Sequence, residues 1–256
     1  MCAPKLSAAM AQCQAEVAPR TRVYGDWLLL YGASSLMTSV ILNAPETNFG
    51  AVVTWRTADV RTEQPNAWQT AFPATPGAAY DTNGALYPHT FDVSAAAASA
   101  MFVQAAVSPV LKSGTAVKES SVRLWSSVNS KGFVVARQRI ELQSGLGADT
   151  AVFSVGSPFP CVGVNGLMFG LVFTGVSGTV TATPVWRGFG SGDPTRPGGW
   201  TGLGALAGVT GNATVNSGNL GITTTDLMLA QAGLQLTVTG TNPRAVIDVI
   251  VAAKEA

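Results

Sequence analysis

The sequence is poor in charged residues, which make up 11% of its 256 residues, whereas an average soluble domain has about 25%. The 15 Lys and Arg residues nearly balance the 14 Asp and Glu residues, and no basic run is present. Because proteins that follow a phosphate backbone need clustered positive charge, we expect no direct binding of nucleic acid. A surface with so few charges loses its water easily, which favours broad contact with other proteins.

Residues that bind metals or form disulfides are also scarce. The chain has three cysteines, Cys2, Cys13 and Cys161, with no CxxC pair, and a single histidine, His89. Because a structural zinc site needs four well-placed ligands, we expect no metal and no cofactor. Widely spaced free thiols indicate a reducing compartment. The first residues lack the apolar core of a secretory signal, and no apolar stretch reaches the about 18 residues of a membrane span.

Glycine and proline, by contrast, are abundant, with 28 and 14 residues. They interrupt the chain too often for long helices and separate short segments rich in Val, Thr, Phe, Leu and Trp, which are typical of strands. Without a βαβ rhythm, this pattern predicts an all-β sandwich or barrel. The predicted strands are 23–31, 36–42, 50–57, 86–93, 101–107, 116–128, 133–143, 151–155, 167–174, 179–187, 220–229, 233–239 and 244–252.

The first 20 residues differ from this pattern. Leu6, Met10, Cys13 and Val17 recur at intervals of four, three and four residues, which is the spacing of one helix face. Pro19 ends this periodicity. We therefore predict a short amphipathic helical arm over residues 1–20, which packs either on its own domain or on a neighbouring subunit.

Blocks of similar sequence recur in the same order at nearly constant spacing. Trp55-Arg56 recurs at Trp186-Arg187, 131 residues later, and Trp68 recurs at Trp200, 132 residues later. Two apolar runs behave similarly, at offsets of 131 and 133: Met37–Leu42 with Met168–Phe173, and Met101–Ala105 with Leu234–Val238. The repeat predicts two tandem, duplicated β-sandwich domains of jelly-roll-like type, over residues 21–130 and 131–256.

The repeated tryptophans and arginines are the candidate site residues: Trp55, Arg56, Trp68, Trp186, Arg187 and Trp200. In each half, a long connection, 58–85 or 188–219, follows the Trp-Arg pair. One interpretation is that the tryptophans stack on sugar rings while each arginine holds a polar group. The other is that Trp55 and Trp186 are core residues, while Trp68 and Trp200 anchor the long connections with an arginine against each ring.

No constellation of residues predicts catalysis. His89 and Asp92 are three residues apart in a predicted strand, so alternation places them on opposite faces. The Gly-x-Ser-x-Gly elbow of serine hydrolases is absent, and the acidic residues form no recognisable pair or calcium loop. We therefore expect that the protein is not an enzyme.

The chain resembles bacteriophage and other viral structural proteins. The resemblance covers most of residues 23–252 and lies in the few charges, the short Ala-, Gly-, Thr- and Val-rich strands, and strand ends such as Leu234–Asn242. It implies a non-enzymatic virion protein, assembled in the host cytoplasm, that contacts copies of itself, as a trimer or pentamer, and other capsid proteins. The alternative is a carbohydrate-binding β-sandwich module that acts as a receptor-binding or fibre component.

Overall fold

The computed structural model describes residues 10–17, 22–43, 49–69, 71–74, 79–82, 84–111, 120–143, 149–190 and 197–256. Within these ranges the chain is nearly all antiparallel β-structure, and its one helix is the single turn α1, Ser94–Ala97. The chain divides into two compact units. The first contains residues 1–58 and 62–130, and the second contains residues 59–61 and 131–256.

The first unit has two four-stranded sheets. One has the order β1-β8-β4-β6, and in the other β7 pairs with β2, β3 and β5. The strands are β1 Met10–Val17, β2 Val23–Tyr24, β3 Leu28–Leu29, β4 Ser35–Asn43, β5 Phe49–Ala58, β6 Leu86–Asp92, β7 Phe102–Leu111 and β8 Ser120–Val128.

Alternation along the strands of the first unit explains how its two sheets pack. In β4, Leu36, Val40 and Leu42 are fully buried, whereas Met37 between them is exposed, as expected for a strand with one face on the core. The buried side chains of β4 and β8 form one cluster with those of β5 and β7. The unit is therefore a sandwich with its apolar core between the sheets.

The second unit forms one connected seven-stranded sheet network, because two very long strands run through both of its layers. The first half of β11 pairs with the second half of β15, and the second half of β11 pairs with the first half of β15. The strands are β9 Gly132–Gln143, β10 Asp149–Pro160, β11 Val164–Phe189, β12 Thr201–Gly202, β13 Ala213–Asn216, β14 Leu220–Gly221 and β15 Leu229–Glu255.

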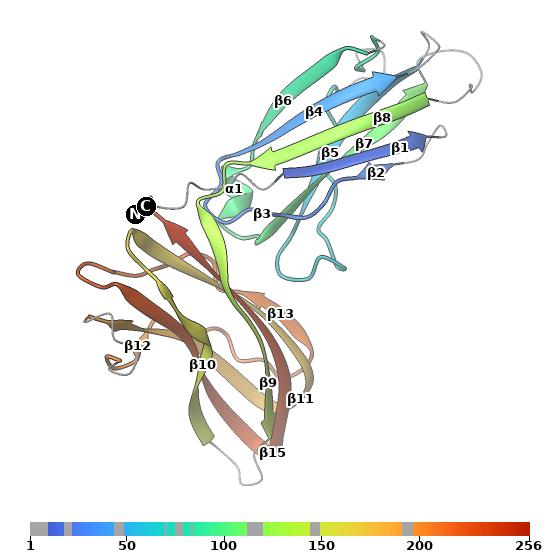
Figure 1. Ribbon diagram of the computed structural model, residues 1–256. Coiled ribbons are helices and arrows are strands. Elements are labelled where there is room, and N and C mark those ends of the chain that lie inside the picture. The colour runs from blue at the N-terminus through green and yellow to red at the C-terminus, as the bar shows by residue number, and fades with distance from the viewer. Residues whose placement is uncertain are drawn as a thin grey trace. The chain divides into compact units, whose positions relative to one another are not determined.

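Strand order is the same in the two units (Figure 1). The order β1-β8-β4-β6 of the first unit corresponds to β9, the end of β15, the start of β11, and β13 with β14. The order β2/β3-β7-β5 corresponds to β10, the start of β15 and the end of β11. Each unit thus has the strand order of a jelly roll, in which two sheets are joined by Greek-key connections.

The predicted N-terminal helix is wrong where the structure describes it. Residues Met10–Val17 form the edge strand β1, which pairs antiparallel with Ser120–Ser127 of β8. Residues 1–9 and 18–20 of the predicted arm lie outside the described residues. The sequence of β1 also has a period of two, because Ala11, Cys13, Ala15 and Val17 alternate with Gln12, Gln14 and Glu16. Pairing with β8 decides between the two patterns in favour of the strand.

Several other predicted strands differ in extent, and the predicted strands 233–239 and 244–252 are both part of one strand, β15. The predicted strand 23–31 is broken into β2 and β3, around Gly25 and Asp26. The separately predicted strands 167–174 and 179–187 are one strand, β11, which bends where its pairing register shifts between Thr174 and Thr179. The predicted strand 220–229 is limited to β14 and the first residue of β15.

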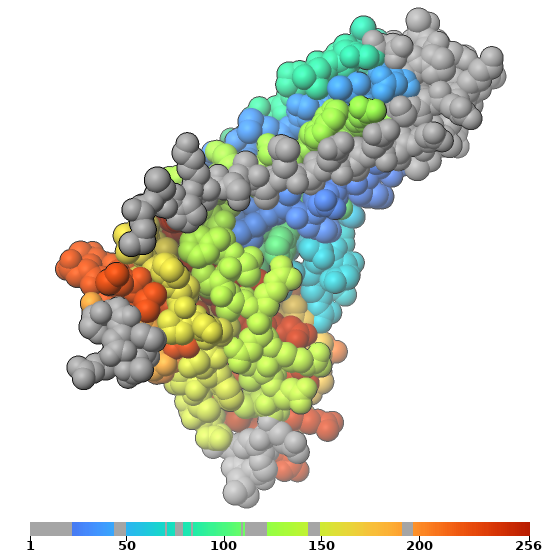
Figure 2. Space-filling view, viewed as in Figure 1, coloured from blue at the N-terminus to red at the C-terminus, as the bar shows by residue number. Residues whose placement is uncertain are grey.

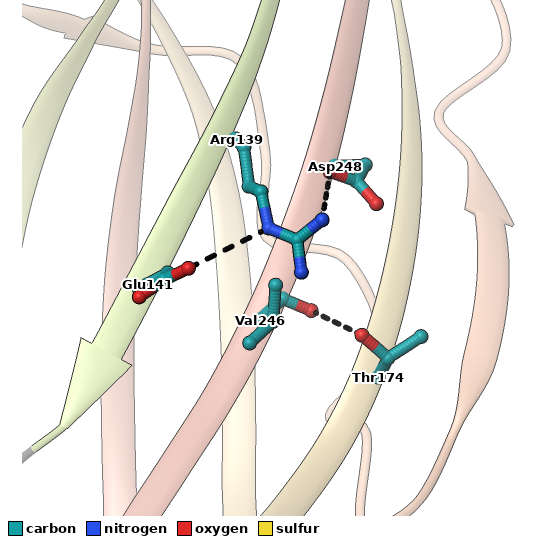
Figure 3. A network of polar contacts seen from close by, with 5 residues as sticks. All are labelled: Arg139, Glu141, Thr174, Val246 and Asp248. Carbon is teal, nitrogen blue, oxygen red and sulfur yellow. Dashed lines mark hydrogen bonds and ion pairs between the residues drawn. The ribbon is translucent and has the colours of Figure 1, made fainter.

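The second unit has a polar outer surface where β9, β15 and β11 lie next to each other. Arg139 Nε lies 3.6 Å from Glu141 Oε1, and its Nη1 lies 3.9 Å from Asp248 Oδ1 (Figure 3). Thr174 Oγ1 donates a hydrogen bond of 3.4 Å to the Val246 carbonyl oxygen on the same face. Strands β9 and β10, which are edge strands of the two layers, contact each other at the surface (Figure 2).

No helix among the described residues is long and apolar enough to cross a membrane.

Candidate functional site

An arginine and a glutamine on neighbouring strands form a hydrogen-bonded pair in the second unit. Arg187 of β11 lies opposite Gln231 of β15 in the pairing register. Its Nε and Nη2 both donate to Gln231 Oε1, at 3.0 and 2.7 Å. Gln231 Nε2 then donates to the Gly156 carbonyl oxygen of β10, at 2.9 Å. These contacts tie three adjacent strands together on one face of the layer.

The same set of contacts occurs in the first unit. Arg56 of β5 lies opposite Gln104 of β7, and its Nε and Nη2 donate to Gln104 Oε1 at 3.0 and 2.8 Å. Gln104 Nε2 donates to the Gly25 carbonyl oxygen at 2.7 Å. Both glutamines are only 7% exposed. We call each set, Arg56–Gln104–Gly25 or Arg187–Gln231–Gly156, an Arg–Gln clamp.

A tryptophan from the following long connection lies over the arginine of each clamp. The guanidinium carbon of Arg56 is 4.5 Å from the Trp68 ring centroid, and that of Arg187 is 4.3 Å from the Trp200 ring centroid. Cations over aromatic faces are attracted by the ring quadrupole, by about 0.5–2 kcal/mol. The clamp therefore holds the start of each long connection against the sheet.

Both long connections run along the edge strand that precedes them. In the first unit, Gln69 N donates to the Trp55 carbonyl oxygen at 2.7 Å, and Phe72 N donates to the Val53 carbonyl oxygen at 2.7 Å. In the second unit, β12 pairs with Trp186, and Leu203 N donates to the Pro184 carbonyl oxygen at 2.8 Å. These segments complete the second layer of each sandwich, so they are less irregular than the sequence suggested.

The electrostatic environment of the first clamp is aromatic. The Arg56 guanidinium carbon also lies 5.3 Å from the Tyr24 ring and 5.4 Å from the Trp27 ring. That of Arg22 lies 4.3 Å from the Trp68 ring. Burial lowers the pKa of Arg56 from its usual value, and the nearby Arg22 acts in the same direction. No described carboxylate pairs with Arg56 or Arg187. Neutral amide oxygens and rings hold both cations, and this arrangement offers no nucleophile or general base.

The structure separates the six candidate residues into two groups. Arg56 meets Trp68 and Arg187 meets Trp200, as described above. Trp55 and Trp186 are half-buried and pack against the cores of their units. They point away from the adjacent arginines because neighbouring residues of a strand point to opposite faces.

Gln104 and Gln231 were not among the candidate residues. The signal for them was the dipeptide Gln104-Ala105, which recurs as Gln231-Ala232 at an offset of 127. The pairing registers show that this offset is the structural one, since Trp55 pairs with Ala105 and Trp186 with Ala232. The predicted match of Met101–Ala105 with Leu234–Val238 is therefore six residues out of register.

An aromatic pocket of about 310 Å³ opens at one side of the first sandwich. It lies between β6 and the connection that runs along β5. Its walls are Trp55, Gln69, Ala71, Phe72, Ala74, His89 and Phe91. We call it the aromatic pocket.

Ring stacking fixes the shape of the aromatic pocket. The Phe72 and His89 rings stack with centroids 3.5 Å apart and an interplanar angle of 10°. Phe91 meets His89 edge-on at 4.5 Å and lies 6.5 Å from Trp55. Burial lowers the pKa of His89 from its usual value, which favours the neutral imidazole. The pocket walls therefore carry no charge near neutral pH.

The corresponding side of the second sandwich carries aliphatic residues. Leu203, whose backbone hydrogen bond corresponds to that of Phe72, packs against the core. Leu206, Val215 and Leu220 pack there as well. The aromatic side chains that line the pocket of the first unit therefore have aliphatic counterparts, such as Leu203, in the second unit.

The residues considered for catalysis do not form a catalytic group. His89 lies in the aromatic pocket, whereas the Asp92 carboxylate accepts hydrogen bonds from Ser94 N at 2.9 Å and Ser94 Oγ at 2.6 Å. These bonds lower the pKa of Asp92. Among the described residues, no three His, Cys, Asp or Glu side chains gather as metal ligands do.

Of the three cysteines, Cys161 is the one whose side chain the structure describes. Its thiol is free and buried, and Sγ lies 3.6 Å from the Leu227 carbonyl oxygen, to which it donates. Burial raises the pKa of this thiol, so it is a poor nucleophile at neutral pH.

No protein-family model and no curated protein sequence matches the chain. Similar solved structures include the tandem CBM22-1–CBM22-2 domain of Paenibacillus barcinonensis Xyn10C, with 9% identity, coverage of 98% of this chain and 93% of that one, and a TM-score of 0.30. The infectious bursal disease virus Gt strain matches with 11% identity, coverage of 97% and 72%, and a TM-score of 0.33. The PBSX exported protein XepA matches with 13% identity, coverage of 95% and 86%, and a TM-score of 0.28. Likenesses this low give no basis for transferring a function.

Proposed function

We propose that the chain is a non-enzymatic structural protein of a virion, which assembles on or in a capsid by contacts with copies of itself and with other capsid proteins. The observation that carries this proposal is an apolar sheet face on the first unit. Met37, Ile41, Leu86, Pro88 and Trp125 lie on the outer face of β4, β6 and β8. We call this the β8–β4–β6 outer face.

These five side chains of the face are apolar although they point away from the core, and Ser39, Thr90 and Ser127 lie among them. Met37 is 45% exposed and Leu86 is 58% exposed. They are close together, because Ile41 pairs with Leu86 and the adjacent Ser39 pairs with both Trp125 and Pro88. Contiguous exposed apolar side chains of this kind mark surfaces that bind other proteins. Their burial is worth about 25 cal/mol per Å² before the cost of association.

In the second unit, the outer surface of β9 and β15, which correspond to β1 and β8, carries the ion pairs of Arg139, Glu141 and Asp248. We infer that the two units are copies of one ancestral domain. Contacts in which the β8–β4–β6 outer face meets a different patch of the next copy close into a ring when the rotation between copies allows it, so we propose a symmetric homo-oligomer, such as a trimer or pentamer. The proposal places the protein in the virion, assembled in the host cytoplasm, with no direct contact to nucleic acid or membrane.

Sedimentation velocity of the full chain over a range of concentrations tests the proposal. We expect a mass several times that of the 26.3 kDa chain. The variant Leu86→Glu should sediment as a monomer, because it places a charge on the most exposed of the large apolar side chains of this face.

The matched control is Val152→Glu, since Val152 is 43% exposed on β10 of the second unit. This variant should keep the mass of the unmodified protein. A wild-type chain that stays monomeric at high concentration and does not bind virion shells contradicts the proposal. So does an oligomer that both glutamate variants leave intact.

A further inference from the structure

We infer that the aromatic pocket of the first unit binds one neutral sugar ring. This inference goes beyond the proposed role in assembly and does not depend on it. It rests on the composition of the pocket walls, the hydrogen-bonding groups among them, the size of the pocket, and the contrast with the second unit.

Rings supply most of the pocket wall. Trp55, Phe72, His89 and Phe91 line it from β5, β6 and the connecting segment between these strands. Aromatic side chains offer a flat apolar surface on which the C–H face of a ring-shaped ligand packs. Phe72 is 38% exposed, so the pocket is reached from solvent without unfolding.

Two side chains in the wall are able to hydrogen-bond a ligand. Gln69 carries an amide with two donors and an acceptor, and His89 carries an imidazole. No described residue hydrogen-bonds the side-chain amide of Gln69 or the ring nitrogens of His89. A purely hydrocarbon ligand leaves both groups unused, whereas a ligand with hydroxyl groups around an apolar ring satisfies them.

The pocket walls and volume limit the charge and size of the ligand. None of the seven lining residues is acidic or basic apart from His89, and burial favours the neutral form of His89. A phosphate, a carboxylate or an ammonium group therefore finds no partner there. The volume of about 310 Å³ lies at the small end of ligand pockets, which begin at roughly 300 Å³. A single uncharged sugar ring meets each of these conditions.

Trp68 and Trp200, which lie over the clamp arginines, are less suitable for binding a sugar. An arginine lies over the ring of Trp68 and of Trp200, so each ring is already engaged. Both units also share this arrangement. The aromatic pocket, by contrast, is present in the first unit, where the second has Leu203 and Leu206 packed against the core.

Ligand-observed NMR and isothermal titration of the full chain test the inference, with methyl glycosides of glucose, galactose, mannose, xylose and N-acetylglucosamine as probes. We expect at least one of these sugars to bind at millimolar concentration. Phe72→Ala and, independently, Gln69→Ala should weaken that binding by roughly tenfold, which is about 1.4 kcal/mol. The two variants keep the inference testable if one of them folds poorly.

The matched control is Leu203→Ala, the corresponding position in the second unit, which should leave the sugar affinity unchanged. Phe72→Ala should also leave the sedimenting mass unchanged, so that loss of sugar binding and loss of assembly are separate results. Binding by none of the sugars overturns the inference. Sugar binding that survives both pocket variants overturns it as well. Binding of N-acetyl-tryptophanamide in place of sugars assigns the pocket to a side chain of a partner protein, and this also overturns the inference.

Discussion

The two units differ in what surrounds their Arg–Gln clamps more than in the clamps themselves. In each unit the clamp joins an arginine, a buried glutamine and a glycine carbonyl oxygen with nearly equal distances. One side of the sandwich, by contrast, carries the aromatic pocket in the first unit, and the corresponding side of the second unit carries aliphatic residues that pack on its core. Features that both units keep serve the sandwich, and features that one unit has alone are where a specific function is to be sought.

The packing of Trp68 and Trp200, which lie over the clamp arginines, shows the same contrast in detail. A methyl group added at Gly233 would lie 2.5 Å from Trp200, so Trp200 packs directly on the backbone of β15. At the equivalent register position the first unit has Ala106. There Trp68 lies against Arg22, Arg56 and Tyr24. One unit therefore seats the tryptophan on a glycine, and the other surrounds it with cations and a ring.

The largest effect is expected from removing the glutamine of either clamp. Gln104→Leu or Gln231→Leu leaves a half-buried guanidinium without its acceptor and a glycine carbonyl without its donor. We expect a loss of about 3 kcal/mol from the affected unit in each case. Amide hydrogen exchange resolved by peptide reports the two units separately. If each substitution speeds exchange in its own unit, the two clamps have equal roles. If only one of the two substitutions speeds exchange, the comparison fails.

Gly233→Ala should act on the second unit alone. The new methyl group meets Trp200 at 2.5 Å and Val185 at 2.9 Å, and overpacking of this kind costs about 2 kcal/mol. The control is Gly199→Ala, next to Trp200, where an added methyl group meets nothing within 4 Å. Denaturant unfolding should show a lower midpoint for the first variant and an unchanged midpoint for the second. Equal midpoints for the two variants contradict the seating of Trp200 on the backbone.

Shortening one side chain on the corresponding side of each unit should sharpen the difference between the aromatic pocket and its aliphatic counterpart. Leu203→Ala removes a side chain that packs on the core of the second unit, and we expect a loss of about 1.5 kcal/mol. Phe72→Ala removes a side chain that is 38% exposed, so the loss in the first unit should be smaller. Thermal unfolding of both variants provides the measurement. A greater loss for Phe72→Ala indicates that its ring is needed mainly for stability.

The smallest effect concerns pH, and it should be confined to the first unit. Burial lowers the pKa of His89, so the folded state favours the neutral ring. Its contribution is present above the usual histidine pKa of about 6.5 and is lost as the pH falls below that value. Between about pH 7.5 and pH 5.5, peptides of the first unit should lose protection from exchange. His89→Phe should flatten this dependence, and the second unit, which has no histidine, should show none of it.

Strand positions followed from the sequence where alternation and turn residues agree. The predicted strand 36–42 is the centre of β4, in which Leu36, Val40 and Leu42 point to the core and Met37 and Ile41 lie on the outer face. The predicted helix over residues 1–20 is wrong over Met10–Val17, because this segment carries two periodicities and its decisive partner, β8, lies more than a hundred residues away. Local patterns do not contain that information.

The candidate site was found in part for a similar reason. Trp55-Arg56 and Trp186-Arg187 stand out because tryptophan is rare and the pairs recur at a fixed offset. Gln104 and Gln231 are ordinary polar residues until the register of β5 with β7 and of β11 with β15 places them opposite the arginines. The aromatic pocket could not be predicted from the sequence for the same reason, because Trp55, Phe72 and Phe91 come together only when distant segments pair.

Double-mutant cycles on both clamps test most directly the claim that one clamp, built twice, holds both units. The cycles combine Arg56→Met with Gln104→Leu, and Arg187→Met with Gln231→Leu, and they are followed by peptide-resolved hydrogen exchange. We predict coupling energies of about 2 kcal/mol in each unit, equal to within about 0.5 kcal/mol. A strong coupling in one unit and none in the other would contradict the claim.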